Sequence, residues 1–88
     1  MKTLTVTNRY KKCLKRCAKR GLDFDKLDTI LDLLESEEPL PERCRPHILS
    51  GDWAGYWECH IESDSLLIWE DTGDAIILVA TGTHSDLF

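Results

Sequence analysis

The most informative segment of this chain is residues 55–64, Gly55-Tyr56-Trp57-Glu58-Cys59-His60-Ile61-Glu62-Ser63-Asp64. Its apolar and polar side chains alternate up to Glu62, which is the period-two pattern of a β-strand. This alternation places His60 on the same strand face as Glu58 and Glu62. Histidine is the side chain best suited to move a proton near neutral pH, so this strand is the first candidate for chemistry.

Three further segments with strand patterns surround this one. Residues 47–49 form a short strand before it, and residues 66–69 form a more fully buried strand after it. Residues 71–74 have the composition of a hairpin turn, and residues 75–80 form the next apolar strand. A tail follows from Gly82 to Phe88. Because consecutive strands usually pair, we expect an antiparallel meander.

The first half of the chain has the pattern of one strand and two helices. Residues 3–6 predict a short strand, and residues 9–19 and 24–35 each have an apolar stripe at helical spacing. Thr7 or Asn8 can cap the first helix, Gly21 ends it, Asp23 or Asp25 can cap the second, and Glu37-Glu38-Pro39-Leu40-Pro41 breaks it. The sequence therefore predicts an α+β domain over residues 1–88 with the order β-α-α-β-β-β-β. Both helices are expected on one face of a mostly antiparallel sheet.

The charge of the chain is unevenly distributed. Its 88 residues are enough for one small domain. The net charge of this domain is −5. Residues 1–22 contain no acid and eight basic residues, which are Lys2, Arg9, Lys11, Lys12, Lys15, Arg16, Lys19 and Arg20. From Arg45 onward Arg45 is the only basic residue, against eight acids. The basic helix can contact a polyanion locally or can simply be a solvated face, while the acidic total argues against generic nucleic-acid binding.

The cysteines and the N-terminus indicate a reducing compartment. No apolar run approaches the length of a membrane span, and the N-terminus lacks the apolar core of a signal peptide. We therefore expect a cytoplasmic protein whose four cysteines are reduced and serve as small apolar residues: Cys13, Cys17, Cys44 and Cys59. A zinc site at Cys13 and Cys17 is the alternative, but the tight cysteine pairs of structural zinc sites are missing.

Three histidines and one aspartate can meet in a single cleft of this predicted sheet. The strands that carry His47 and His60 are consecutive, Asp64 lies at the hinge into the next strand, and His84 follows the last strand. Imidazoles with a carboxylate, and no serine or cysteine elbow motif, suit acid–base catalysis on a phosphodiester. Each histidine can instead be a surface or hydrogen-bonded residue. A three-histidine metal site lacks the usual ligand spacing.

The neighbours of these residues are expected to be structural. Glu58 and Glu62 are predicted to be solvated strand residues. The three tryptophans are predicted to lie in the core or at its rim rather than to stack on bases: Trp53, Trp57 and Trp69. For Trp57, which lies on the strand of His60, stacking on a base remains an alternative.

Several motifs together resemble a known family of toxins. They are Tyr10-Lys11-Lys12, Leu14-Lys15-Arg16, Leu40-Pro41, His47-x-Leu49-x-Gly51-x-Trp53, Glu58-Cys59-His60-Ile61-Glu62-x-Asp64, Leu67-Ile68 and Thr81-Gly82-Thr83-His84-Ser85-Asp86-Leu87-Phe88. In these motifs the chain resembles the RelE/ParE superfamily of type II toxin–antitoxin systems, most closely the YafQ branch. The resemblance covers almost the whole chain and implies the small RelE-like fold, in agreement with the predicted order of elements.

The resemblance implies a ribosome-dependent mRNA endoribonuclease that needs no metal or cofactor. The ribose 2′-OH would attack the phosphodiester, with Asp64 or His60 as base, His84 as acid, and His47 and His60 stabilising the phosphate charge. Substrate-binding positions would be Phe88, Lys11, Lys12, Lys15, Arg16 and Arg45. The implied partners are a cognate antitoxin, the ribosome and mRNA, with operator DNA bound only through the antitoxin complex and no membrane contact.

This chain departs from the family pattern at three positions. Trp57 replaces an arginine, Ser65 replaces a tryptophan, and Ser50 replaces a lysine, and the chain is acidic where these toxins are generally basic. A lost arginine–phosphate contact removes a charge-assisted hydrogen bond worth about 1.5–3 kcal/mol. We therefore expect weaker RNA or ribosome affinity with an intact acid–base set. The alternative is an attenuated binding module that engages an antitoxin and modulates operator binding.

Overall fold

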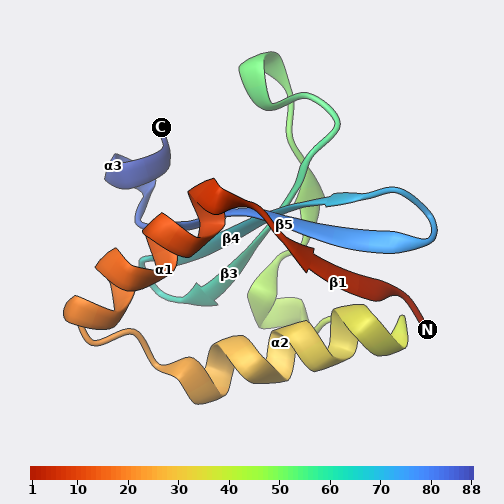
Figure 1. Ribbon diagram of the computed structural model, residues 1–88, viewed down its shortest axis with the longest axis horizontal. Coiled ribbons are helices and arrows are strands. Elements are labelled where there is room, and N and C mark those ends of the chain that lie inside the picture. The colour runs from red at the N-terminus through yellow and green to blue at the C-terminus, as the bar shows by residue number, and fades with distance from the viewer.

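The computed structural model describes residues 1–88 as three helices and a five-stranded mixed sheet (Figure 1). The elements are β1 (Thr3–Val6), α1 (Asn8–Lys19), α2 (Phe24–Ser36), β2 (His47–Ile48), β3 (Trp57–Glu62), β4 (Ser65–Asp71), β5 (Ala75–Gly82) and α3 (His84–Leu87), with short 3₁₀ turns η1 (Glu42–Cys44) and η2 (Gly51–Trp53). The strand order is β1-β5-β4-β3-β2. Only the β1–β5 pair is parallel, so the predicted α+β class and the mostly antiparallel sheet are confirmed. None of the three helices has both the length and the apolar composition of a membrane-spanning segment.

The two long helices begin at the predicted caps. The Thr7 hydroxyl accepts a hydrogen bond from the backbone N–H of Tyr10 at 3.1 Å and donates one to the carbonyl of Leu78 at 3.0 Å. This residue therefore caps α1 and also fastens its start to β5. The Asp23 carboxylate caps α2 by accepting from the N–H of Asp25 at 3.0 Å.

Side chains are buried on both faces of the sheet. One face packs against α1 and α2 through a core cluster of Tyr10, Leu27, Ile30, Cys44, Cys59, Ile61, Leu67, Trp69, Ile76 and Leu78. The other face carries a smaller cluster of Cys13, Leu66, Ile68, Ala80 and Leu87, against which Leu49, Trp53, Tyr56 and Val79 pack. The prediction that both helices lie on one face is therefore correct for α2 and incomplete for α1, whose Cys13 belongs to the second cluster. The second face is also partly covered by α3 and the η2 loop (Figure 1).

The chain reaches α3 through a β-bulge. Ile68 pairs with Ala80 and Trp69 pairs with Leu78, so Val79 is an extra residue in β5. The bulge reverses the alternation of side chains, which turns Ala80 to the face opposite Leu78. The predicted tail is wrong in two respects, because Gly82 still belongs to β5 and residues 84–87 form a helical turn on this second face.

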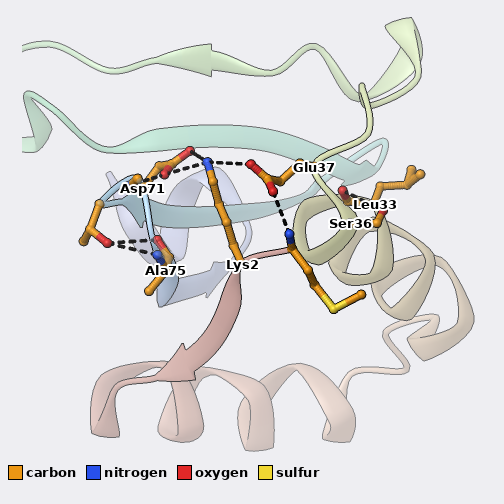
Figure 2. A network of polar contacts seen from close by, with 9 residues as sticks. Lys2, Leu33, Ser36, Glu37, Asp71 and Ala75 are labelled. Carbon is orange, nitrogen blue, oxygen red and sulfur yellow. Dashed lines mark hydrogen bonds and ion pairs between the residues drawn. The ribbon is translucent and has the colours of Figure 1, made fainter.

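The opposite end of the sheet is fastened by a network of ion pairs (Figure 2). The Lys2 ammonium lies 2.8 Å from an oxygen of Asp71 and 4.0 Å from Glu37, and the N-terminal amine lies 2.9 Å from Glu37. The hydrogen bond to Asp71 raises the pKa of Lys2, and the same contact lowers the pKa of Asp71. The network joins the chain start, the end of α2 and the β4–β5 hairpin, away from His60, which pairs with Leu66 near the start of β4.

Candidate active site

Strand β3 places His60 on the face that α3 partly covers. In the β3–β4 register His60 pairs with Leu66 and Glu58 pairs with Ile68, both of which belong to the smaller cluster. Trp57 pairs with Trp69 and their rings stack with centroids 6.3 Å apart on the other face. This confirms a structural role for Trp57. Its position on the opposite face also means that the Arg-to-Trp departure does not alter the immediate surroundings of His60.

Four rings form a row across the candidate site. The His60 and His84 ring centroids lie 6.1 Å apart, as do those of His84 and Phe88. Trp53 continues the row, with its ring 6.2 Å from Phe88. His84 and Phe88 are exposed and His60 is half-buried, so the row forms an accessible aromatic surface.

His47 lies opposite Glu58, which is two residues before His60 on the neighbouring strand, and contacts the Glu58 side chain. The two residues are directly opposite in the β2–β3 pair, and His47 Nε2 lies 3.2 Å from Glu58 Oε1. The other ring nitrogen, Nδ1, donates to the carbonyl of Arg45 at 2.8 Å. The prediction that Glu58 is solvated is wrong, because its side chain is 5% exposed. Position along a strand could not reveal this burial, because it depends on the pairing of β3 with β2, which sets His47 directly opposite Glu58.

Asp64 is the one predicted catalytic residue that contacts none of the other three. It lies exposed in the β3–β4 turn and forms no hydrogen bond or ion pair with a histidine. It lines a small hollow of about 140 Å³ together with Thr83 and Asp86, at the base of α3. The structure thus brings His60 and His84 together, places His47 next to Glu58, and leaves Asp64 on the side of α3 where Thr83 caps the helix.

Cys59 is excluded as a nucleophile by its environment. It adjoins His60 in sequence, but its side chain is fully buried on the opposite face of β3. Burial raises the pKa of the Cys59 thiol, which suppresses the reactive thiolate. All four cysteines are free and buried, as predicted.

Asp86 holds α3 in place. The Asp86 carboxylate accepts from the backbone N–H of Thr83 at 3.0 Å, and the Thr83 hydroxyl accepts from the N–H of Asp86 at 3.2 Å, which completes a capping box. The Arg20 guanidinium lies 2.6 Å from the same carboxylate. This capping box, Thr83-x-x-Asp86, is the sequence signal that would have predicted the helical turn.

We expect the docking of α3 to weaken in acid. The backbone N–H of Thr83, followed by the hydrogen bond from Arg20, lowers the pKa of Asp86. A carboxyl group whose pKa is lower in the folded state stabilises that state fully above its unfolded pKa of about 3.9, and the stabilisation is lost as the pH falls through the lowered value. NMR signals of Thr83 and Phe88 followed from roughly pH 6 to pH 2 should show this transition, and Asp86→Asn should remove most of it. An unchanged transition in the variant would contradict the assignment.

A basic hollow adjoins His60 on its other side. It has a volume of about 330 Å³, and its lining includes Lys26, Arg43, Arg45 and His60. It also includes Glu62, whose carboxylate lies 3.7 Å from the Lys26 ammonium. The predicted substrate-binding residue Arg45 therefore lies beside a predicted catalytic histidine. Lys26 and Arg43 were missed, because neither belongs to the basic run of the first helix. Neither Arg43 nor Arg45 forms an ion pair, which leaves both charges available to an anion.

The basic residues of α1 lie at different distances from the candidate site. Lys12 and Arg16 line a hollow with Asp86 and Leu87, at the foot of α3. Lys11 and Lys15 are exposed and make no ion pair. The basic face of α1 is therefore solvated, and its Arg16 edge meets the helix that carries His84.

The arrangement defines a small α+β protein with the groups needed for acid–base chemistry on an anionic substrate. The family model for the bacterial toxin of type II toxin–antitoxin systems, YafQ, matches residues 2–88. The chain belongs to this family. The mRNA interferase toxin YafQ of Escherichia coli K12 is 36% identical over 86 residues, which are 97% of this chain and 94% of that protein.

Solved structures agree with this assignment. A copper-bound mutant toxin from Helicobacter pylori superposes with a TM-score of 0.94 at 32% identity, covering 100% of both chains. YafQ in the Escherichia coli DinJ–YafQ toxin–antitoxin complex superposes with a TM-score of 0.90 at 35% identity, covering 99% of this chain and 97% of that one. In the present structure no group of three or more histidine, cysteine, aspartate or glutamate side chains is arranged to hold a metal ion.

Proposed function

We propose that this protein is an mRNA endoribonuclease that acts on the ribosome as the toxin of a type II toxin–antitoxin pair. The observation that supports this best is the placement of two imidazoles, His60 and His84, with ring centroids 6.1 Å apart on an accessible surface. Each needs an approach of about 2.6–3.2 Å to an oxygen, so both can reach oxygens of one phosphodiester group. The Escherichia coli relative that is 36% identical is named an mRNA interferase.

The reaction is internal transfer of a phosphoryl group within the RNA. His60 takes the proton of the ribose 2′-OH, the 2′-oxygen forms a bond to phosphorus, and the bond from phosphorus to the 5′-oxygen breaks. His84 donates a proton to that leaving oxygen, and the product carries a 2′,3′-cyclic phosphate. His47 stabilises the charge on the phosphate. Of the two bases considered, His60 is favoured over Asp64 because it faces His84, whereas Asp64 lies in the turn beyond it.

Substrate contacts follow from the exposed rings and cations around the histidines. Phe88 is 59% exposed and follows α3, where it can stack on a base. Arg45 lies in the hollow beside His60, and Lys11, Lys12, Lys15 and Arg16 on α1 are proposed to contact ribosomal or messenger RNA. A cognate antitoxin is the proposed protein partner, as DinJ is for Escherichia coli YafQ.

Induced expression tests the proposed function. Expression of the wild-type chain without an antitoxin should arrest growth, and messages recovered from the arrested cells should carry new cleavage sites within translated regions. Uncleaved messages in arrested cells would contradict the endoribonuclease assignment.

The net charge of −5 favours a second candidate, a binding module with attenuated nuclease activity. An acidic protein is repelled by RNA at long range, which lowers its rate of association with ribosomes. Normal growth during expression, together with tight binding to the product of the adjacent reading frame, would support this alternative.

A further inference from the structure

Glu58 is a buried carboxylate with an incomplete set of partners. Its side chain is 5% exposed, one oxygen contacts His47, and the other oxygen, Oε2, is buried without any hydrogen-bond partner. A buried charged group with an unsatisfied oxygen is costly, and most buried polar atoms in proteins are satisfied. Such a residue therefore calls for an explanation other than stability.

The surroundings of His47 supply that explanation. A carbonyl oxygen can only accept, so His47 Nδ1 carries a proton and donates it to Arg45 at 2.8 Å. His47 Nε2 faces Glu58 Oε1 at 3.2 Å. At this distance the contact is attractive when a proton lies between Nε2 and Oε1, either as an imidazolium beside a carboxylate or as a carboxylic acid beside a neutral imidazole. The imidazole ring is held at both nitrogens and cannot rotate without breaking one contact.

The backbone supports the same arrangement. Arg45 has a φ of 47°, which is in the left-handed region and is uncommon for a residue other than glycine. Backbone strain of this kind persists where the surrounding structure requires it and often occurs at functional sites. Here it lets the Arg45 carbonyl meet the ring of a residue two positions later. The ring itself remains 48% exposed, so a ligand can reach His47 while Glu58 stays shielded.

We infer that Glu58 is a positioning residue for His47. It fixes the orientation of the imidazole and shares one proton with Nε2, and it does not touch the RNA. This inference rests on the proposed function for its effect on catalysis, but the contact itself can be tested without any RNA. Aspartate, asparagine or leucine at this position would not reproduce both the reach and the proton-sharing oxygen of Glu58.

The first test is spectroscopic. Nitrogen-15 NMR of the histidine side chains should show His47 with hydrogen-bonded protons at its ring nitrogens in the wild type. Glu58→Gln should shift the His47 signals and leave those of His84 in place, whereas Glu70→Gln, the same change at an exposed strand residue without an ion pair, should shift neither. Identical His47 signals in wild type and Glu58→Gln would overturn the inference, whether or not the protein cleaves RNA.

The second test is kinetic and uses a double-mutant cycle on ribosome-bound mRNA. Glu58→Gln should lower kcat about ten-fold or more and change KM little, since His47 is proposed to stabilise phosphate charge and complete loss of one such donor costs about 10²–10³-fold in kcat. In a His47→Gln background the same substitution should have no further effect, because the residue it positions is gone. The thermal unfolding midpoint of the single Glu58→Gln variant should be unchanged or higher, since a buried charge is removed. Equal losses of kcat in both backgrounds, or a fall in the unfolding midpoint that accounts for the lost activity, would overturn the inference.

Discussion

Replacing His84 with alanine is expected to lower the rate of mRNA cleavage by about 10²–10⁴-fold, the range that a positioned general acid contributes. His84 is exposed at the first position of α3, and its side chain makes no hydrogen bond, while the backbone carbonyl that accepts from Phe88 is kept in the alanine variant. The loss should therefore appear in kcat, while the thermal unfolding midpoint stays close to that of the wild type. Single-turnover cleavage of a message on programmed ribosomes measures the effect directly.

Ser85 provides the matched control for this substitution. It is the next residue of α3, it is exposed, and its side chain makes no hydrogen bond. Ser85→Ala should cleave at the wild-type rate. Wild-type activity in the His84→Ala variant would contradict the assignment of His84 as the general acid that acts together with His60.

Truncating Leu87 is expected to detach α3 and to lower activity without altering His84 itself. Leu87 is 8% exposed and packs in the smaller cluster with Cys13, Leu66, Ile68 and Ala80. Leucine-to-alanine changes at buried positions cost about 2–5 kcal/mol. Because α3 is only four residues long and packs mainly on β5, this cost falls mainly on its docking, and activity should approach that of the His84→Ala variant.

Leu87→Met is the control, because a volume-conserving change usually costs less than about 1.5 kcal/mol. It should keep α3 docked and retain most of the activity. Hydrogen exchange of the Leu87 and Phe88 amides, which bond to Thr83 and His84, would show whether the helix is docked in each variant. Full activity in Leu87→Ala, with fast exchange at these amides, would show that a docked α3 is not needed.

Much of the fold could be predicted from periodicity and caps. Thr7 and Asp23 are the observed N-caps, and the helical stripe on the first helix correctly predicts that Tyr10, Cys13 and Cys17 are buried. The alternation in residues 55–62 correctly separates the face of His60 from the face of Cys59. These features depend on local backbone geometry, which a short stretch of sequence specifies well.

Two features of the site depend on contacts between distant segments and were not predicted. Glu58 is buried because β2 lies against it, and a strand of two residues offers no pattern that reveals its own coverage. The bulge at Val79 turns the end of β5 toward the second face, and no residue type marks that position. The helical turn of α3 is different, since Thr83 and Asp86 already carry its capping signal.

The predicted catalytic set is brought together only in part. His60 and His84 face each other, and His47 is close to Glu58 rather than to Asp64. Spacing along the chain could not distinguish which carboxylate a histidine would meet, because strand register and turn position decide this. Glu58, predicted to be a scaffold residue, contacts a catalytic candidate in the structure. Asp64, predicted as a candidate base, is exposed and contacts no histidine.

The most direct test of the central claim is cleavage of a message that lacks a single 2′-hydroxyl. An mRNA with one 2′-deoxynucleotide immediately before the scissile phosphate, programmed on the ribosome, should not be cut at that bond by the wild-type protein. The same substitution one nucleotide further away should permit normal cleavage, and its product should end in a 2′,3′-cyclic phosphate. Cleavage of the deoxy-substituted bond at the normal rate would contradict attack by the 2′-oxygen and with it the roles proposed for His60 and His84.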